Sequence, residues 1–224
     1  MVQTMRLNAA IVVLLTSLVA ATYGFGIYLF AQLVPDMQAS LGFDFSYVGS
    51  ITASAQLGFL ICALLAVWLT PKIGGGWMIV ASGAVCALAL LLIPLSNNIL
   101  IIGALLTLLA GTAATVFVPM VDVVARVTAY RYRGLAMGLV SSGTSYGVAI
   151  NSLLVPLYAA QGEWRSVWWW VGLLTVAMAV LVLVVFKKGG LLSNTPPPTV
   201  TTMAVELTVP SRRLTLIKPW VLLI

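Results

Sequence analysis

Residues 167–186 read VWWWVGLLTVAMAVLVLVVF and are followed at once by Lys187 and Lys188. A helix needs about 20 predominantly apolar residues to cross the hydrocarbon core of a bilayer, and this run supplies them. Tryptophan at one end and lysine at the other are residues that anchor a membrane helix in its two interfaces. The stretch therefore predicts a transmembrane helix whose lysine end lies in the cytoplasm.

Five further apolar runs precede this one along the chain. The six predicted spans are Asn8–Val34, Tyr47–Thr70, Trp77–Leu95, Ile99–Val121, Gly134–Tyr158 and Val167–Phe186. The runs are too continuous for the alternating strands of a membrane barrel, so helices are the expected spanning element. The first run extends to Val34, which is too long for the apolar part of a signal peptide. We therefore expect an all-α integral membrane protein, with residues 1–188 forming a six-helix transmembrane bundle.

The basic residues are distributed unevenly over the connections between these runs. All but Arg165 of the eleven lysines and arginines lie at the amino end, on alternate connections, or after the sixth run. Loops rich in Lys and Arg are kept in the cytoplasm. We expect a multi-pass protein of the cell inner membrane with a cytoplasmic N-terminus. The net charge of +6 then reflects this bias and some attraction to the lipid bilayer, and does not indicate nucleic-acid binding.

Composition removes several classes of function. The chain is 62% hydrophobic and 7% charged, against about 25% charged residues in soluble domains. It has no histidine, and therefore lacks the commonest metal ligand and the usual general base near neutral pH. Cys62 and Cys86 lie inside apolar runs and form no close pair. We expect no metal, no cofactor and no enzyme: a Ser–His protease is excluded, and a paired-aspartate protease would need two mid-span acids.

The character of the chain changes after Lys188. Residues 189–216 contain the Pro196–Pro198 run and the Arg212-Arg213 pair, which predicts a cytoplasmic linker. Residues 217–224 begin another apolar run with Trp220, but it is too short to span. We interpret it as the start of a truncated seventh span.

Three local patterns are similar to those of one family. Residues 67–76, VWLTPKIGGG, match the loop pattern Gly-x-Leu-Ala-Asp-Arg-x-Gly-Arg-Arg at Leu69, Lys72 and Gly74. They depart from it at the leading glycine (Val67), the acidic residue (Pro71) and the trailing basic pair (Gly75-Gly76). Residues 132–138, YRGLAMG, match Arg-Gly-x-Ala-x-Gly, and residues 162–165, GEWR, resemble a Gly-Trp-Arg turn. With six spans and an inside linker, the chain resembles the amino-terminal half of a major facilitator superfamily transporter. Two family patterns are missing: Thr107 replaces an arginine, and residues 143–147 lack a Gly-Pro pair.

The resemblance implies a fold and a mechanism. In this family each half consists of two three-helix repeats, and the solute binds between the halves near the middle of the membrane. Spans one, two, four and five are expected to line the cavity, with three and six at the periphery. The implied function is secondary active transport of a small organic solute by alternating access, with this chain as the amino-terminal half. The chain has no Gly-x-x-x-x-Gly-Lys-Ser/Thr loop and therefore no built-in ATP site.

Polar side chains concentrate in the four spans expected to line the cavity. Phe25, Tyr28 and Gln32 recur at i, i+3 and i+7, which predicts a shared helix face. The candidate solute contacts are Phe25, Tyr28, Gln32, Gln56, Thr112, Thr115, Ser145, Tyr146 and Asn151. The alternative is that these groups only hydrogen-bond neighbouring helices or, for Ser and Thr, their own helix backbone. The candidates are neutral and aromatic, and no cation lies in mid-span to bind an anion, so they suit a neutral or weakly amphipathic solute.

The end of span four suggests a gate. Asp122 precedes Arg126 by four residues, so an ion pair within the helix is the simplest interpretation. The functional hypothesis is that Asp122 binds the loop of Lys72 in one access state and releases it in the other. The gating candidates are Lys72, Gly74, Asp122, Arg126 and Arg133. In span five, Gly134 with Gly138 and Gly143 with Gly147 form two small-xxx-small pairs, which predict close helix packing.

One alternative concerns the length of the chain. If it ends at Ile224, a truncated orphan half would have no transport activity of its own and would act only as an assembly partner or be degraded. The partner of a functional half would be the missing C-terminal half or a second copy of this chain.

Overall fold

The computed structural model describes residues 2–158 and 162–192, and side chains from residue 7. Span one is a continuous rod made of α1 (Val2–Val19), the π-helix η1 (Ala20–Tyr28) and α2 (Leu29–Leu41). The other spans are α3 (Phe45–Ile73), α4 (Gly75–Leu92), α5 (Ile99–Val127), α6 (Arg133–Tyr158) and α7 (Trp164–Lys188). Two short 3₁₀ turns, η2 (Ile93–Leu95) and η3 (Tyr130–Tyr132), follow α4 and precede α6. All elements in the described part of the chain are helical, which confirms the predicted fold class.

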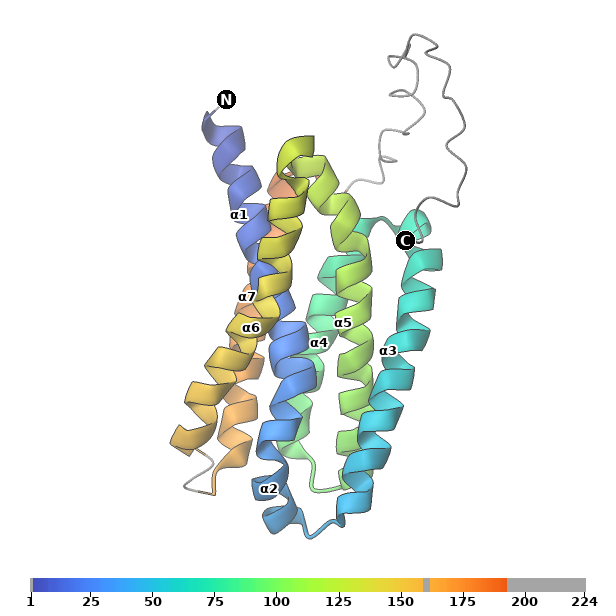
Figure 1. Cartoon of the computed structure of the whole chain (residues 1–224), viewed down its shortest axis with the longest axis vertical. Helices are drawn as coiled ribbons and strands as arrows, with labels where there is room; N and C mark the ends of the chain where they lie inside the picture. The colour runs from blue at the N-terminus through green and yellow to red at the C-terminus, as the bar shows by residue number, and fades with distance from the viewer. Residues whose placement is uncertain (1, 159–161, 193–224) are drawn as a thin grey trace, which may run out of the picture.

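The helices form two layers. α6, the span-one rod, α5 and α3 lie in the front layer of Figure 1, with α4 and α7 behind them. α3 packs mainly on α5, α6 packs on α1 and η1, and α4 packs on both α5 and α7. Spans one, two, four and five therefore share one layer, and spans three and six form the other, as the resemblance implied.

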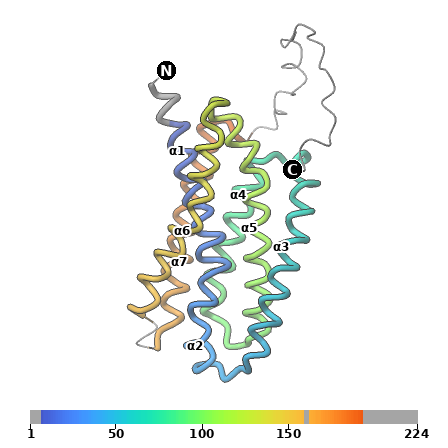
Figure 2. Tube along the Cα trace, in the orientation of Figure 1, coloured from blue at the N-terminus to red at the C-terminus, as the bar shows by residue number. Residues whose placement is uncertain are grey.

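The N-terminus, the α3–α4 turn and the α5–α6 connection lie at one end of the bundle (Figure 2). This end, here called the basic end, carries Lys72, Arg126, Arg131, Arg133, Lys187 and Lys188. The opposite end, the far end, carries Asp36, Asp44, Glu163 and Arg165. The separation of charge predicted from the sequence is therefore present in the fold.

Five segments of the described chain are long and apolar enough to cross a membrane. They are Leu7–Leu41, Phe45–Ile73, Gly75–Leu95, Ile99–Val127 and Trp164–Lys188. α6 is not among them, because serine, threonine, glycine and asparagine interrupt its apolar residues. Its 26 residues make a helix about 39 Å long that packs along span one, so we treat it as the most polar of six spans.

Helix boundaries follow from local chemistry. The Asp44 carboxylate accepts the Ser46 backbone N–H at 2.8 Å and begins α3, and the Asn98 side chain accepts the Leu100 N–H at 2.9 Å and begins α5. Gly74 separates α3 from α4 with a φ of 93°, a conformation that favours glycine. Spans two and four are longer than predicted, ending at Ile73 and Val127 in place of Thr70 and Val121.

Two apolar clusters fill the bundle. The far-end cluster is centred on Phe25, Leu29, Met37, Trp164 and Trp168, and the basic-end cluster on Ile11, Leu15, Val116, Met120 and Phe186. The basic-end cluster also contains Leu191, which follows α7 and packs so closely on Gly76 that a Cβ there would collide with the Leu191 carbonyl. The start of the predicted linker is therefore folded onto the bundle. The rest of that linker and the predicted seventh span, residues 193–224, lie outside the described residues.

Candidate functional site

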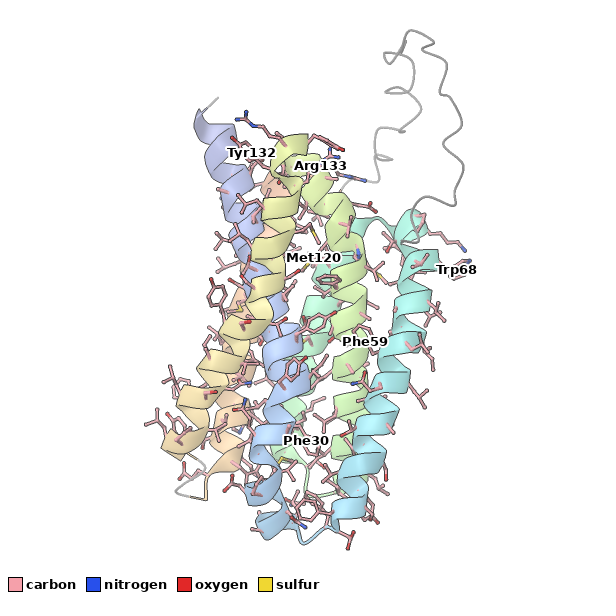
Figure 3. All side chains as sticks on the ribbon, viewed as in Figure 1. Phe30, Phe59, Trp68, Met120, Tyr132 and Arg133 are labelled. Atoms are coloured by element: carbon pink, nitrogen blue, oxygen red, sulfur yellow. The ribbon has the colours of Figure 1, made fainter. Side chains whose placement is uncertain are left out.

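Three aromatic rings from three spans meet near the middle of the front layer. The Tyr23 ring of η1 lies edge-to-face with Phe59 of α3, at a centroid distance of 6.2 Å, and with Phe117 of α5, at 5.9 Å. The interplanar angles are 72° and 70°, the geometry that the quadrupoles of aromatic rings favour. All three side chains are half-buried, so one side of this aromatic triad remains open. Figure 3 labels Phe59 between α3 and α5.

Sequence reasoning did not single out the aromatic triad. The sequence signal that could have found it is the position of each ring along its span. Tyr23, Phe59 and Phe117 each lie near the middle of a membrane-spanning segment. These segments are Leu7–Leu41, Phe45–Ile73 and Ile99–Val127, respectively. Aromatic residues at span edges belong to the interfacial belt, whereas these three cannot. Their convergence depends on the packing of η1 against α5 and of α3 against α5, which no single run reveals.

A narrow crevice opens beside the triad. It encloses about 60 Å³ between span one, α3 and α5, and its lining includes Phe30, Thr52, Gln56, Phe59 and Leu106. Gln56 is the one predicted solute contact in this lining, and its side chain is exposed. The crevice therefore combines an apolar wall with a single amide group.

A second crevice of about 300 Å³ lies between α1 and α6. Its lining is Val12, Val13, Thr16, Ser17, Leu139, Ser142 and Tyr146. The Ser17 and Ser142 hydroxyls donate to their own helix at Val13 O, 3.0 Å, and Leu139 O, 2.7 Å, so their lone pairs stay available as acceptors. Tyr146, a predicted contact, is 57% exposed. This crevice offers hydroxyl groups where the first offers rings.

The shared face predicted for span one is wrong. Phe25 is fully buried in the far-end cluster, whereas Tyr28 is 46% exposed and Gln32 is half-buried. The cause is η1, because the i→i+5 bonds of a π-helix place more than 3.6 residues in each turn. An i, i+3, i+7 spacing that crosses this segment therefore does not return to the same side.

The other predicted contacts separate into two groups. Thr112 is buried and donates to Leu109 O at 2.7 Å, and Thr115 donates to Gly111 O and Thr112 O, both at 3.2 Å. Both threonines thus bond their own helix backbone, the alternative given above. Ser145 is exposed on α6 beside Tyr146, whereas Asn151 is fully buried. The nine candidates do not converge on one site, and contact with a solute stays a prediction for each.

The two glycine pairs of α6 differ in their surroundings. A Cβ on Gly143 would collide with the Thr16 carbonyl, and a Cβ on Gly147 would collide with the Ala20 carbonyl and Gly24 Cα. A Cβ on Gly134 or Gly138 would meet none of the described atoms within 4 Å. Close packing is therefore confirmed for Gly143 and Gly147, whereas no described atom packs against Gly134 or Gly138 in this way.

At the basic end, the gating candidates are held by local contacts. The Lys72 ammonium lies 3.2 Å from the centroid of the Trp68 ring. The Asp122 side chain is exposed on α5, and no ion pair joins it to Arg126 among the described residues. The simple Asp122–Arg126 ion pair is thus not formed in this structure. Arg133 donates from Nη2 to Ala125 O at 2.8 Å and from Nε to Thr128 O at 3.4 Å, closing the C-terminal end of α5 (Figure 3).

At the far end, Arg165 joins α7 to the end of α4. Its Nη2 donates to Asn97 Oδ1 at 2.6 Å, its Nε donates to Pro94 O at 3.2 Å, and its guanidinium lies 4.3 Å from the Trp164 ring centroid. Arg165, the basic residue at the far end of the bundle, therefore has a structural role in joining α7 to the end of α4.

Comparison with known proteins identifies the family. A family model described as Major Facilitator Superfamily matches residues 16–224. The chain belongs to the major facilitator superfamily. Membership confirms the resemblance seen in the sequence and makes the bundle that of a multi-pass membrane protein.

Two curated relatives of this superfamily member are similar to it along most of its length. They are the putative uncharacterized transporter YgaY of Escherichia coli strain K12 and the uncharacterized transporter YgaY of Escherichia coli O157:H7. Each is 27% identical over 177 residues, which is 78% of this chain and 44% of the relative. The chain therefore spans about half the length of the curated relatives it matches.

Proposed function

We propose that this chain forms one half of a secondary active transporter that moves a small organic solute by alternating access. Its relatives carry the name transporter, and its superfamily supports the same activity. The observation that carries the proposal is the aromatic triad, which gathers half-buried rings from three front-layer spans near the middle of the bundle. Half-buried rings at this depth form a surface that a solute or a facing helix would cover.

The chemistry of the front layer favours an uncharged solute. Among the described residues, every charged side chain lies near the basic end or the far end, and the middle presents rings, hydroxyls and the Gln56 amide. An ion placed in this low-dielectric region without a countercharge would be strongly disfavoured. We therefore propose a neutral or weakly amphipathic solute, with its apolar part at the triad and its polar part at the hydroxyls of the α1–α6 crevice.

A second six-span half is proposed to face the front layer. The front layer alone leaves Tyr28 and Tyr146 exposed by about half, at 46% and 57%, and the curated relatives are about twice as long as the match to this chain. The second half would come from a continuation of the same chain or from a second copy. The alternative, an orphan half that only assembles or is degraded, predicts no movement of solute in either arrangement.

The test measures solute uptake in membrane vesicles. The chain alone, and the complete reading frame that contains it, are expressed separately, and uptake of a panel of neutral aromatic and hydroxylated compounds is compared with empty vesicles. We expect saturable uptake with a complete pair of halves, and a loss of about tenfold for Tyr23→Leu, equivalent to about 1.4 kcal/mol. Phe45→Leu, at a far-end side chain that is 65% exposed, is the matched control and should leave uptake unchanged. Absence of uptake for every compound with both halves present would contradict the proposal, as would turnover of a compound without transport.

We also propose that Lys72 and Asp122 form a gate at the basic end. In this structure the Lys72 ammonium rests on Trp68, and Asp122 is exposed on α5. A state in which Lys72 leaves the ring for the carboxylate would bring the α3–α4 turn against α5. Lys72→Asp should slow uptake, and Asp122→Lys in the same protein should partly restore it. Additive losses in the double variant would exclude the gate.

A further inference from the structure

Asn151 occupies an unusual environment for an amide side chain. It is fully buried on α6, and its Nδ2 donates to the Gly24 carbonyl of η1 at 2.7 Å. Its Oδ1 is also buried and has no hydrogen-bond partner among the described residues. A buried amide with an unused acceptor is costly in an apolar bundle, so the single bond that it does make requires an explanation.

That bond reaches the middle of η1, the π-helical segment of span one. η1 extends over nine residues, whereas π-helix usually occurs as single-turn bulges and often at functional sites. Gly24 is the fifth of these nine residues. The bond therefore attaches α6 to the centre of the π-helix of span one.

The π-helix determines which side chains span one presents to each neighbour. With η1 as it stands, Tyr23 meets Phe59 and Phe117, Phe25 enters the far-end cluster, and Tyr28 is exposed on the bundle surface. If the segment became α-helical, the register would shift, and each residue of shift turns a side chain by about 100° around the helix axis. Such a turn would remove the tyrosines from their present positions.

Among the described residues, Asn151 makes the one side-chain hydrogen bond between α6 and η1. Gly147 and Gly24 meet through backbone atoms, and Gly143 packs on the Thr16 carbonyl in the same way. Gly143, Gly147 and Asn151 follow each other at intervals of four residues on one face of α6. The two glycines permit close approach but have no group with which to hold a carbonyl, whereas the Asn151 amide does so.

We propose that Asn151 is a positioning residue that holds span one in its π-helical register and thereby sets the solute-contacting side chains. The aromatic triad is complete only in this register, and the exposure of Tyr28 depends on it. The inference rests on the proposed function only where it assigns the triad and Tyr28 to solute contact. The register itself can be measured without transport.

The test uses thiol accessibility in the full chain, purified in detergent, with Cys62 and Cys86 replaced by alanine. Single cysteines are introduced by Tyr28→Cys and, separately, by Phe25→Cys, and their rates of reaction with N-ethylmaleimide are compared. With Asn151 present, the cysteine at 28 should react at least tenfold faster than the one at 25. With Asn151→Leu, which has no donor, we expect this ratio to fall at least fivefold.

Two further variants separate positioning from folding. Asn151→Asp keeps the shape, and a buried, protonated carboxyl group can donate its O–H to the Gly24 carbonyl, so the ratio should stay near that of the parent. Asn151→Ser is small enough to fold but too short to reach the carbonyl, so it should behave like Asn151→Leu. Ser152→Leu, at an exposed neighbouring position, is the control and should not change the ratio.

The inference would be overturned by an unchanged ratio in both the leucine and serine variants at 151, or by an equal fall in the ratio with Asn151→Asp. A changed ratio in a protein that moves no solute would contradict the proposed function and leave the inference standing.

Discussion

Gly147 of α6 lies against Gly24 of η1 with their backbones in contact. A Cβ added to either residue would collide with the Cα of the other. Small residues let transmembrane helices approach this closely, and the approach is what allows the Asn151 amide to reach the Gly24 carbonyl. The contact therefore links helix packing directly to the conformation of span one.

Gly147→Ala should destabilise the protein, because the added methyl group would force α6 away from η1. Overpacking of this kind costs about 1–3 kcal/mol. Gly138→Ala is the matched control on the same helix, where a Cβ meets no described atom, and replacing a helical glycine there should be neutral or stabilising. Thermal unfolding of both variants in detergent measures the difference. Equal midpoints for the two would show that the close contact does not limit stability.

Arg133→Gln should also lower the unfolding midpoint. The guanidinium donates to the carbonyl oxygens of Ala125 and Thr128 at the C-terminal end of α5, where the helix dipole favours positive charge. Loss of these bonds at a half-buried site should cost about 1 kcal/mol. Arg131→Gln is the control, because that exposed side chain contacts Tyr132 and not the end of α5. A larger loss for Arg131→Gln would refute the assignment.

The apolar runs and charge bias predict the fold well because span length and loop charge are properties of single segments. Side-chain partners are properties of pairs of segments, and the two glycine pairs of α6 show the difference. Gly134–Gly138 and Gly143–Gly147 have identical spacing, yet only the second pair faces another backbone. Likewise, Phe25 and Tyr28 appear equivalent under an α-helical period, and only the π-helix places one in the core and the other on the surface.

Acid should weaken the start of α3. The Ser46 backbone N–H and side chain donate to the Asp44 carboxylate and lower its pKa below the usual 3.8. Because the folded-state pKa is the lower one, this cap stabilises the protein above the unfolded pKa and is lost as the pH falls through the folded value. Asp44→Asn keeps an acceptor but does not titrate, so the difference in midpoint between parent and variant should shrink from pH 6 toward pH 3. Parallel curves would show that the cap contributes nothing measurable.

The orientation of the bundle gives the last prediction. The basic end holds Tyr130, which is 81% exposed, and the far end holds the exposed Glu163. Loops rich in Lys and Arg stay in the cytoplasm, so the basic end should face inward. After Cys62 and Cys86 are replaced by alanine, a membrane-impermeant maleimide should label Glu163→Cys in intact cells and Tyr130→Cys only after permeabilisation. The reverse labelling pattern would show that the bundle has the opposite orientation in the membrane. The proposed Lys72–Asp122 gate would then lie on the outer side.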